Sequence, residues 1–173
     1  MKHSASTCVM IVAAALGLHG QVTRQREPLP PDLAEASITV TGVGDKSVML
    51  SLSDLAKLPQ HTVKTTDRGT PASFSGVLLT DVLAKADMPT GVTFHSTAVS
   101  YYLLVEARDR YRVVFAWAEL DTAFMDKPVY LVMKRDGEPL SDEDGPFQLV
   151  VPGEKRHARW VRQVTALSIR QAN

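Results

Sequence analysis

The sequence predicts an α+β domain that is mostly β, with layered mixed sheets and a few short helices. Apolar residues alternate with polar ones, or form runs rich in aromatic and β-branched residues, along most of the chain, which is typical of strands. Segments with helical spacing are short and end near proline or glycine. The 173 residues, 45% hydrophobic and 22% charged, suit one globular domain.

The first twenty residues are expected to form a signal peptide. Lys2 precedes an apolar run over residues 8–18 that is too short to span a bilayer. The alternative is an uncleaved N-terminal anchor. We expect cleavage near Gly20, which removes the single cysteine and gives a periplasmic or secreted protein with no membrane attachment after cleavage. Residues 21–36, which contain several prolines, are predicted to be an extended lead-in to a domain over residues 37–170.

Turn and capping signals set the expected elements of the first half. Apolar residues alternate on both sides of GVGDK (residues 42–46), which indicates a hairpin. Ser53 is placed to N-cap one short helix, and Thr80 or Asp81 another. The expected elements are a hairpin over 38–52, a helix over 54–58, a strand over 61–66, a loop over 67–73 and a helix over 81–86 that stops near 89–91.

The second half reads as more strand-rich. Two aromatic and β-branched runs flank RDR, which predicts a second hairpin. The expected elements are strands over 101–107 and 111–116, a helical turn over 118–124, strands over 129–133 and 147–151, a helical turn within 157–164 and a final strand over 166–169.

Charge and motifs exclude several function classes. Lys plus Arg equals Asp plus Glu at 19 each, so no overall basic field attracts nucleic acid. His61, His95 and His157 lack zinc-ligand spacing, and the acidic run SDEDG (residues 141–145) suits a solvated turn better than a calcium loop. Ser75 lacks a nucleophile-elbow context, and no dinucleotide or P-loop motif occurs. No metal site is expected.

A cluster of cations stands out in GPFQLVVPGEKRHARWV (residues 145–161). Within five positions the stretch holds Lys155, Arg156, His157 and Arg159. The cluster follows a strand and the turn Pro152-Gly153, and Trp160 anchors its far side. A charged surface is one interpretation. The other is an anion site, in which free backbone N–H groups and basic side chains hold a phosphate.

The same stretch carries a resemblance to a known family. DGPFQLVVPGEKRHARWVRQV (residues 144–164) resembles the terminal motif of sulfite oxidase-like molybdopterin-binding domains, G-P-x-R-L-V-x-P followed by K/R-W-V-x-x-I. Three further segments resemble the family in the same order: SLSDLAKLP, FSGVLLTDVLAKAD and VEARDRYRVVFAWAEL, the last with Arg110 where glycine is usual. The similarity covers about residues 37–170.

The resemblance implies a mixed α+β fold and two-electron oxygen-atom transfer chemistry. It also implies a pocket for a pterin cofactor, in which basic residues near the terminal motif contact the phosphate of the cofactor. In the family a cysteine before the F-x-G segment binds molybdenum. The matching stretch VKTTDRG (residues 63–69) has no cysteine, and Thr65 or Thr66 lies near that position. Carried over, the predicted cofactor-binding residues are Lys155, Arg156, Arg159, His157, Arg68, Thr65 and Thr66, with no metal ligand.

Two functions remain open at this stage. The first is an exported molybdopterin-binding oxidoreductase-like domain without the usual molybdenum-ligating cysteine. The second is a non-catalytic module that uses the same pocket for another anionic small molecule or a protein partner. A pterin or another anionic small molecule is the expected ligand, and no redox partner can be named. A neutral threonine hydroxyl is a much poorer ligand than a thiolate, so bound molybdenum and catalysis are both in doubt.

Overall fold

The computed structural model describes residues 36–88, 99–121 and 124–172. The fold is α+β and mostly strands, which confirms the predicted class. The predicted signal peptide (residues 1–20), the lead-in up to residue 35, the helix stop at 89–91 and His95 lie outside the described residues. Among those that are described, no helix has the length and apolarity needed to cross a bilayer.

The first sheet has five strands and contains both predicted hairpins. In spatial order they are β2 (Ser47–Ser51), β1 (Ser37–Thr41), β10 (Val164–Gln171), β5 (Tyr101–Ala107) and β6 (Arg112–Ala116). β1 and β10 run parallel, with Thr39 opposite Ala166, and the other pairs are antiparallel. The sheet is therefore mixed, as predicted.

The second sheet is antiparallel. Its strands are β3 (His61–Asp67), β4 (Thr70–Leu78), β7 (Tyr130–Arg135) and β8 (Glu138–Pro139), and β9 (Gln148–Val150) also pairs with β7. The loop predicted over 67–73 is wrong. Only Arg68 and Gly69 form a turn, with φ of 49° and 88°, and Asp67 pairs with Thr70. The strand pairing overrides the turn signals of this segment.

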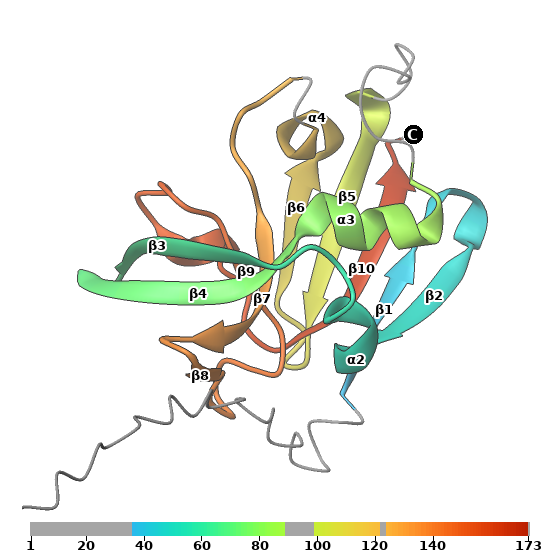
Figure 1. Cartoon of the computed structure of the whole chain (residues 1–173). Coiled ribbons are helices and arrows are strands. Elements are labelled where there is room, and N and C mark those ends of the chain that lie inside the picture. Colours follow the sequence, from blue (N-terminus) through green and yellow to red (C-terminus); the bar gives the residue numbers. More distant parts are fainter. Residues whose placement is uncertain (1–35, 89–98, 122–123, 173) are drawn as a thin grey trace, which may run out of the picture.

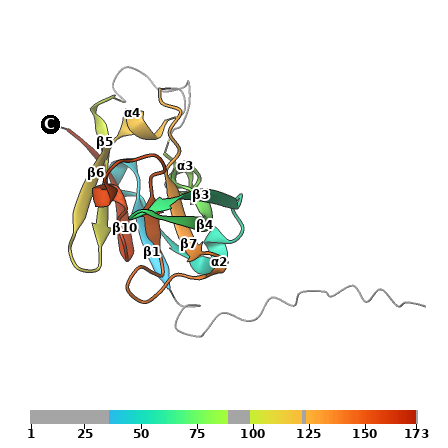
Figure 2. The ribbon, with the colours of Figure 1, turned by 90° about the vertical axis from the view of Figure 1, so that its left-hand side faces the viewer.

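The two sheets pack as layers around one core. Figure 2 shows β1, β5, β6 and β10 on one side of the molecule and β3, β4 and β7 on the other. Core side chains that are at most 1% exposed include Phe74, Leu103, Phe115, Leu131, Leu149 and Leu167. At Gly76 β4 approaches β7 so closely that a Cβ would lie 2.2 Å from the carbonyl oxygen of Leu131. This glycine belongs to the F-x-G segment.

The short helices start at other residues than predicted. Ser51, not Ser53, caps α2 (Leu52–Leu55), because its hydroxyl accepts from the backbone N–H of Asp54 and the Asp54 carboxylate accepts from the Ser51 N–H. Neither Thr80 nor Asp81 caps α3 (Leu79–Leu83). Instead, the first N–H of α3, at Leu79, donates to the carbonyl of Val129 at 2.9 Å.

The remaining helical elements are single turns. Those that lie wholly within the described residues are η1 (Val43–Asp45), η2 (Ala84–Ala86), α4 (Trp117–Leu120) and η4 (His157–Arg159). α4 lies at the end of β6 (Figure 1). η4 confirms the helical turn predicted within residues 157–164 and carries part of the cation cluster.

Candidate functional site

The terminal motif connects β9 to the core through a fixed turn. Trp160 is 6% exposed, and its Nε1 donates to the carbonyl of Val151 at 3.0 Å. Its ring meets Phe74 edge-on, with the centroids 5.6 Å apart. The phenol of Tyr111 donates to the carbonyl of Ala158 at 2.9 Å. These contacts hold η4 in place, and two cavities among the described residues lie on its two sides.

The larger cavity, called here the polar cavity, has a volume of about 300 Å³. It lies where the β3–β4 turn, the β5–β6 turn and the end of β7 meet the terminal motif. Its polar lining includes Arg68, Tyr111, Arg135, Gln148, His157 and Arg162, together with the carboxylates of Asp67, Asp109, Glu143 and Asp144.

Asp67 organises one wall of the polar cavity. Nδ1 of His157 lies 3.2 Å from Oδ1 of Asp67, and Nη1 of Arg135 donates to Oδ2 at 2.8 Å. Because an ionised carboxylate only accepts, Nδ1 is the nitrogen of His157 that donates. The imidazole also stacks on Trp160, with the ring centroids 3.8 Å apart and the planes within 5°. Two partners therefore fix the orientation of His157.

Arg162 is paired on another wall. Its Nη1 donates to Glu143 at 2.7 Å and lies 3.6 Å from Asp144. The hydrogen bond to Glu143 is the main cause that raises the pKa of Arg162 above its usual value. Four carboxylates and three guanidinium groups line the cavity, so its wall carries one net negative charge while His157 is neutral. Within the described residues, Arg68 is the cation of this lining that makes no ion pair.

Gln148 is a buried polar residue in the same lining. It is 6% exposed and lies on β9 between two fully buried neighbours, Phe147 and Leu149. Its backbone pairs with Val132 of β7, which fixes the position of the side chain. The side-chain amide is not among the fully enclosed polar atoms without a partner in the described residues, so Gln148 is a polar residue at the wall of the cavity rather than an unsatisfied buried group.

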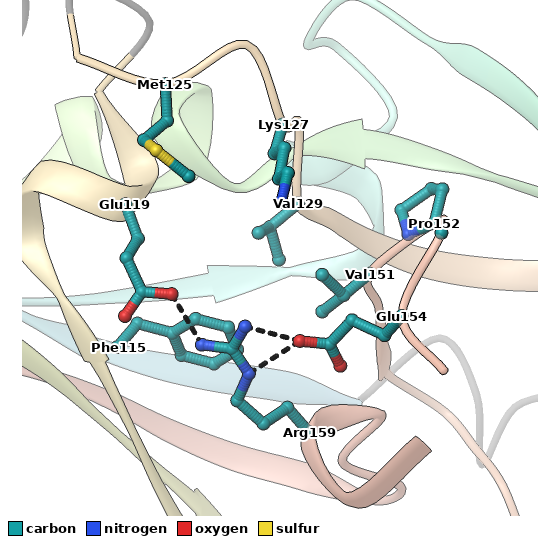
Figure 3. A pocket seen from close by; sticks show the side chains of 10 residues that line it. Phe115, Glu119, Met125, Lys127, Val129, Val151, Pro152, Glu154 and Arg159 are labelled. Carbon is teal, nitrogen blue, oxygen red and sulfur yellow. Dashed lines mark hydrogen bonds and ion pairs between the residues drawn. The ribbon is translucent and has the colours of Figure 1, made fainter. Parts of the chain in front are cut away.

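The smaller cavity, of about 120 Å³, contains Arg159 (Figure 3). Nη1 of Arg159 donates to Glu119 at 2.7 Å, and Nε donates to Glu154 at 2.7 Å. Nη2 donates to the same oxygen of Glu154. The guanidinium lies over the ring of Phe115, 4.6 Å from its centroid. Burial opposes the charge, but the hydrogen bonds to both glutamates outweigh it and raise the pKa of Arg159.

The predicted site residues fall into separate groups. Arg68 and His157 line the polar cavity, whereas Arg159 lines the smaller one. Lys155 and Arg156, which directly precede η4, are exposed and line neither cavity. Thr65 is half-buried and Thr66 exposed on β3, and neither lines a cavity described here. The cations thus do not converge on one point.

Sequence reasoning missed the pairing of Asp67 with Arg135 and the role of Gln148 in the lining. Asp67 and Arg135 are 68 positions apart, so no local motif joins them. A signal for Gln148 was present, because it occupies the fourth position of G-P-x-R-L-V-x-P, where the family pattern has arginine.

A family model described as the oxidoreductase molybdopterin binding domain matches residues 26–173. The chain belongs to this family. Among solved structures, the sulfane dehydrogenase SoxCD from Paracoccus pantotrophus is similar, with a TM-score of 0.59 and 22% identity. The match covers 79% of this chain and 38% of that one, and it shows the fold alone. No protein with a curated description matches the sequence.

This molybdopterin-binding domain departs from the family pattern at a turn. Arg110 stands at the usual glycine of A-x-D-G-Y and adopts φ of 72°, a left-handed conformation that costs most residues about 1–2 kcal/mol. Its N–H still donates to the carbonyl of Ala107 at 3.0 Å. The turn between β5 and β6 therefore keeps a conformation that favours glycine.

Proposed function

We propose that this domain binds a molybdopterin-type ligand at the polar cavity without supplying a sulfur ligand to molybdenum. The observation that carries the proposal is the stretch at residues 63–69. It forms the end of β3 and the start of a tight turn, and its Asp67 and Arg68 line the polar cavity. It has Thr65 and Thr66, which do not line the cavity, near the position of the family's cysteine. The single cysteine of the chain is Cys8.

The lining of the polar cavity fits the organic part of the ligand. Gln148 contributes an amide to the lining, and His157 is held in place by Asp67 and Trp160. Exposed Arg68, Lys155 and Arg156 are available for a phosphate through charge-assisted hydrogen bonds. Arg159 stays a predicted contact, although two glutamates already engage its guanidinium.

The residues do not fit the metal part of the cofactor. A threonine hydroxyl is neutral and hard, whereas molybdenum in this family is bound by sulfur. The described residues also contain no group of three or more His, Cys, Asp or Glu side chains that could hold a metal ion. When bound in family members, the cofactor supplies two-electron oxygen-atom transfer. We propose that this chain binds and orients its ligand but turns over sulfite or sulfoxide little or not at all.

A second candidate is a non-catalytic module for a different anionic small molecule or for a protein partner. Arg68, Lys155 and Arg156 favour it, because they are exposed, make no ion pair with any described residue and suit any phosphate or carboxylate. The amount of pterin bound to the purified protein distinguishes the two candidate functions, because only the first requires it.

We also propose that the protein is exported to the periplasm or secreted. The support is the cationic start and short apolar run within residues 1–20. N-terminal sequencing of the exported form should begin near Gln21, and a cytoplasmic protein that begins at Met1 would contradict this.

The proposed ligand is tested by expressing the full chain in a cell that makes molybdopterin. Bound pterin is released, oxidised and measured by fluorescence. We expect stoichiometric pterin in the wild type and a lower content in Lys155→Ala/Arg156→Ala. Protein without pterin, from cells that load a known family member, would overturn the proposal in favour of the second candidate.

A further inference from the structure

One edge of the first sheet is open and carries no charge. β2 is the last strand of the order β2-β1-β10-β5-β6, and Figure 1 shows it at the right-hand side of the molecule. Its sequence SVMLS (residues 47–51) contains no charged residue and no proline. Proteins usually protect such an edge with charge, proline or a bulge, because its unpaired backbone groups can pair with another strand.

The other strand edges of the described residues are protected. β6, at the opposite edge of the same sheet, begins with the charged Arg112, and β3 carries the exposed Lys64. β8 has two residues, one of which is Pro139. The N–H of Leu149 in β9 donates to the carbonyl of Val161 at 2.8 Å, so the terminal motif covers that edge. Within the described fold, β2 is the edge that lacks these forms of protection.

The hydrogen-bond pattern shows which backbone groups of β2 face outward. The N–H of Gly42 donates to the carbonyl of Lys46 at 2.8 Å, at the turn end of the β1–β2 pair. Hydrogen-bonded pairs alternate along an antiparallel ladder, so every second residue of β2 after Lys46 bonds to β1. The N–H and C=O groups that point to the open edge are those of the remaining residues, Ser47, Met49 and Ser51.

We propose that β2 pairs antiparallel with β2 of a second copy of this chain, about a two-fold axis at Met49. The outward-pointing residues read Ser-Met-Ser in both directions. A two-fold pair therefore places Met49 opposite Met49 and Ser47 opposite Ser51. Two hydrogen bonds join the Met49 residues, and the N–H of each Ser47 donates to the carbonyl of Ser51 in the other copy. The N–H of Ser51 takes no part, because Asp54 already accepts it.

The side chains of this edge also suit a second copy. Met49 lies on the outer face of the sheet and is 68% exposed, and it packs against Met49 of the other copy when the strands pair. Val48, on the core side, is half-buried and lies opposite Leu50 of the other copy. No like charges of β2 oppose each other, and the first sheets of the two copies become continuous. Five residues from each copy make a small interface, so we expect weak, concentration-dependent association.

The dimer is independent of the proposed ligand. β2 and β6 are opposite edges of the sheet, and the polar cavity lies at the β5–β6 turn. Pairing through β2 therefore leaves that cavity open, and variants of β2 should bind the ligand as the wild type does.

Sedimentation equilibrium of the full chain, from about 1 μM to about 1 mM, tests the association. The wild type should be dimeric at the upper end of this range. Met49→Lys places two like charges opposite each other and should weaken the dimer about 10-fold or more. Val114→Lys is the matched control, because Val114 is 52% exposed on the outer face of the opposite edge strand, and it should change the dissociation constant by less than about twofold. A wild type that is monomeric throughout, or equal dissociation constants for the two variants, would overturn the inference.

Disulfide cross-linking tests the register. In a Cys8→Ser background, an introduced cysteine is the single thiol of the chain. Met49→Cys should oxidise to a covalent dimer, because opposed hydrogen-bonded residues have Cα atoms about 5.5 Å apart, within reach of a disulfide. Ser47→Cys should not, because its two copies are offset by about 13 Å along the strands, and Val114→Cys should stay monomeric.

The cysteine variants keep the test decisive if a lysine variant loses stability, because a cysteine at an exposed position changes stability by no more than about 0.5 kcal/mol. Cross-linking of Met49→Cys no faster than that of Ser47→Cys or Val114→Cys would overturn the pairing of β2 with itself.

Discussion

Truncation of Arg159 should destabilise the domain, although the residue belongs to the cation cluster. The side chain joins η4 to α4 through Glu119 and to the turn after β9 through Glu154. Arg159→Ala removes both pairs and the contact with Phe115, and it leaves two carboxylates close to each other.

The magnitude follows from the contacts and their exposure. Breaking a buried ion pair costs about 3–5 kcal/mol, and a surface pair contributes about 0–1 kcal/mol. Arg159 is 32% exposed and Glu119 38% exposed, so the pairs lie between these limits and solvent screens them in part. We expect a loss of about 2–3 kcal/mol of unfolding free energy, or about 5–10 °C in Tm for a domain of this size.

The assay is thermal unfolding followed by circular dichroism at pH 7. Arg156→Ala is the matched control, because that cation is exposed and unpaired among the described residues and should shift stability by no more than about 0.5 kcal/mol. The Tm of Arg159→Lys should lie between those of Arg159→Ala and Arg156→Ala, since an ammonium keeps the charge but cannot donate the several hydrogen bonds of a guanidinium. If Arg159→Ala unfolds at the same Tm as Arg156→Ala, the structural role of Arg159 is refuted.

Three further predictions follow from the turn, the rim and a helix cap. Arg110→Gly should raise stability by about 1 kcal/mol, because glycine adopts the positive φ of 72° without strain, and a lower Tm would contradict the interpretation of this turn. Lys155→Ala/Arg156→Ala should weaken binding of a phosphate-bearing pterin by about 1–3 kcal/mol per charge-assisted bond while Tm hardly changes, and calorimetry that finds equal affinity would remove both residues from the site. Hydrogen bonds from Lys57 and Ser51 hold the pKa of Asp54 well below its ordinary 3.8, so its stabilising effect is present above that pH and is lost as the pH falls. Asp54→Asn should therefore lower Tm at pH 7 and change it less at pH 2, and an equal change at both pH values would argue against the capping role.

Much of the fold could be predicted because alternation and turn chemistry act locally. Both hairpins of the first sheet and the final strand follow from period-two patterns. The start of α3 could not be predicted, because the carbonyl of Val129, about fifty residues further along the chain, accepts the N–H of Leu79. Tertiary hydrogen bonds of this kind override local capping preferences.

The site was predictable only as a cluster of cations. Spacing identified the residues, but not that η4 would direct His157 and Arg159 to different cavities. The partner of His157 is Asp67, which is 90 positions away in the sequence, so no local motif joins them. Charge balance inside a cavity depends on such long-range pairs, so the sequence alone could not indicate it.

The central claim is that the domain keeps a pterin site without the sulfur ligand that catalysis needs. Its most direct test is sulfite oxidation and sulfoxide reduction by the wild type after expression in a cofactor-producing cell, beside Thr65→Cys and Thr66→Cys, with pterin and molybdenum measured in the same samples. We predict little or no turnover by the pterin-containing wild type. Robust turnover by wild-type protein with bound molybdenum would contradict the account.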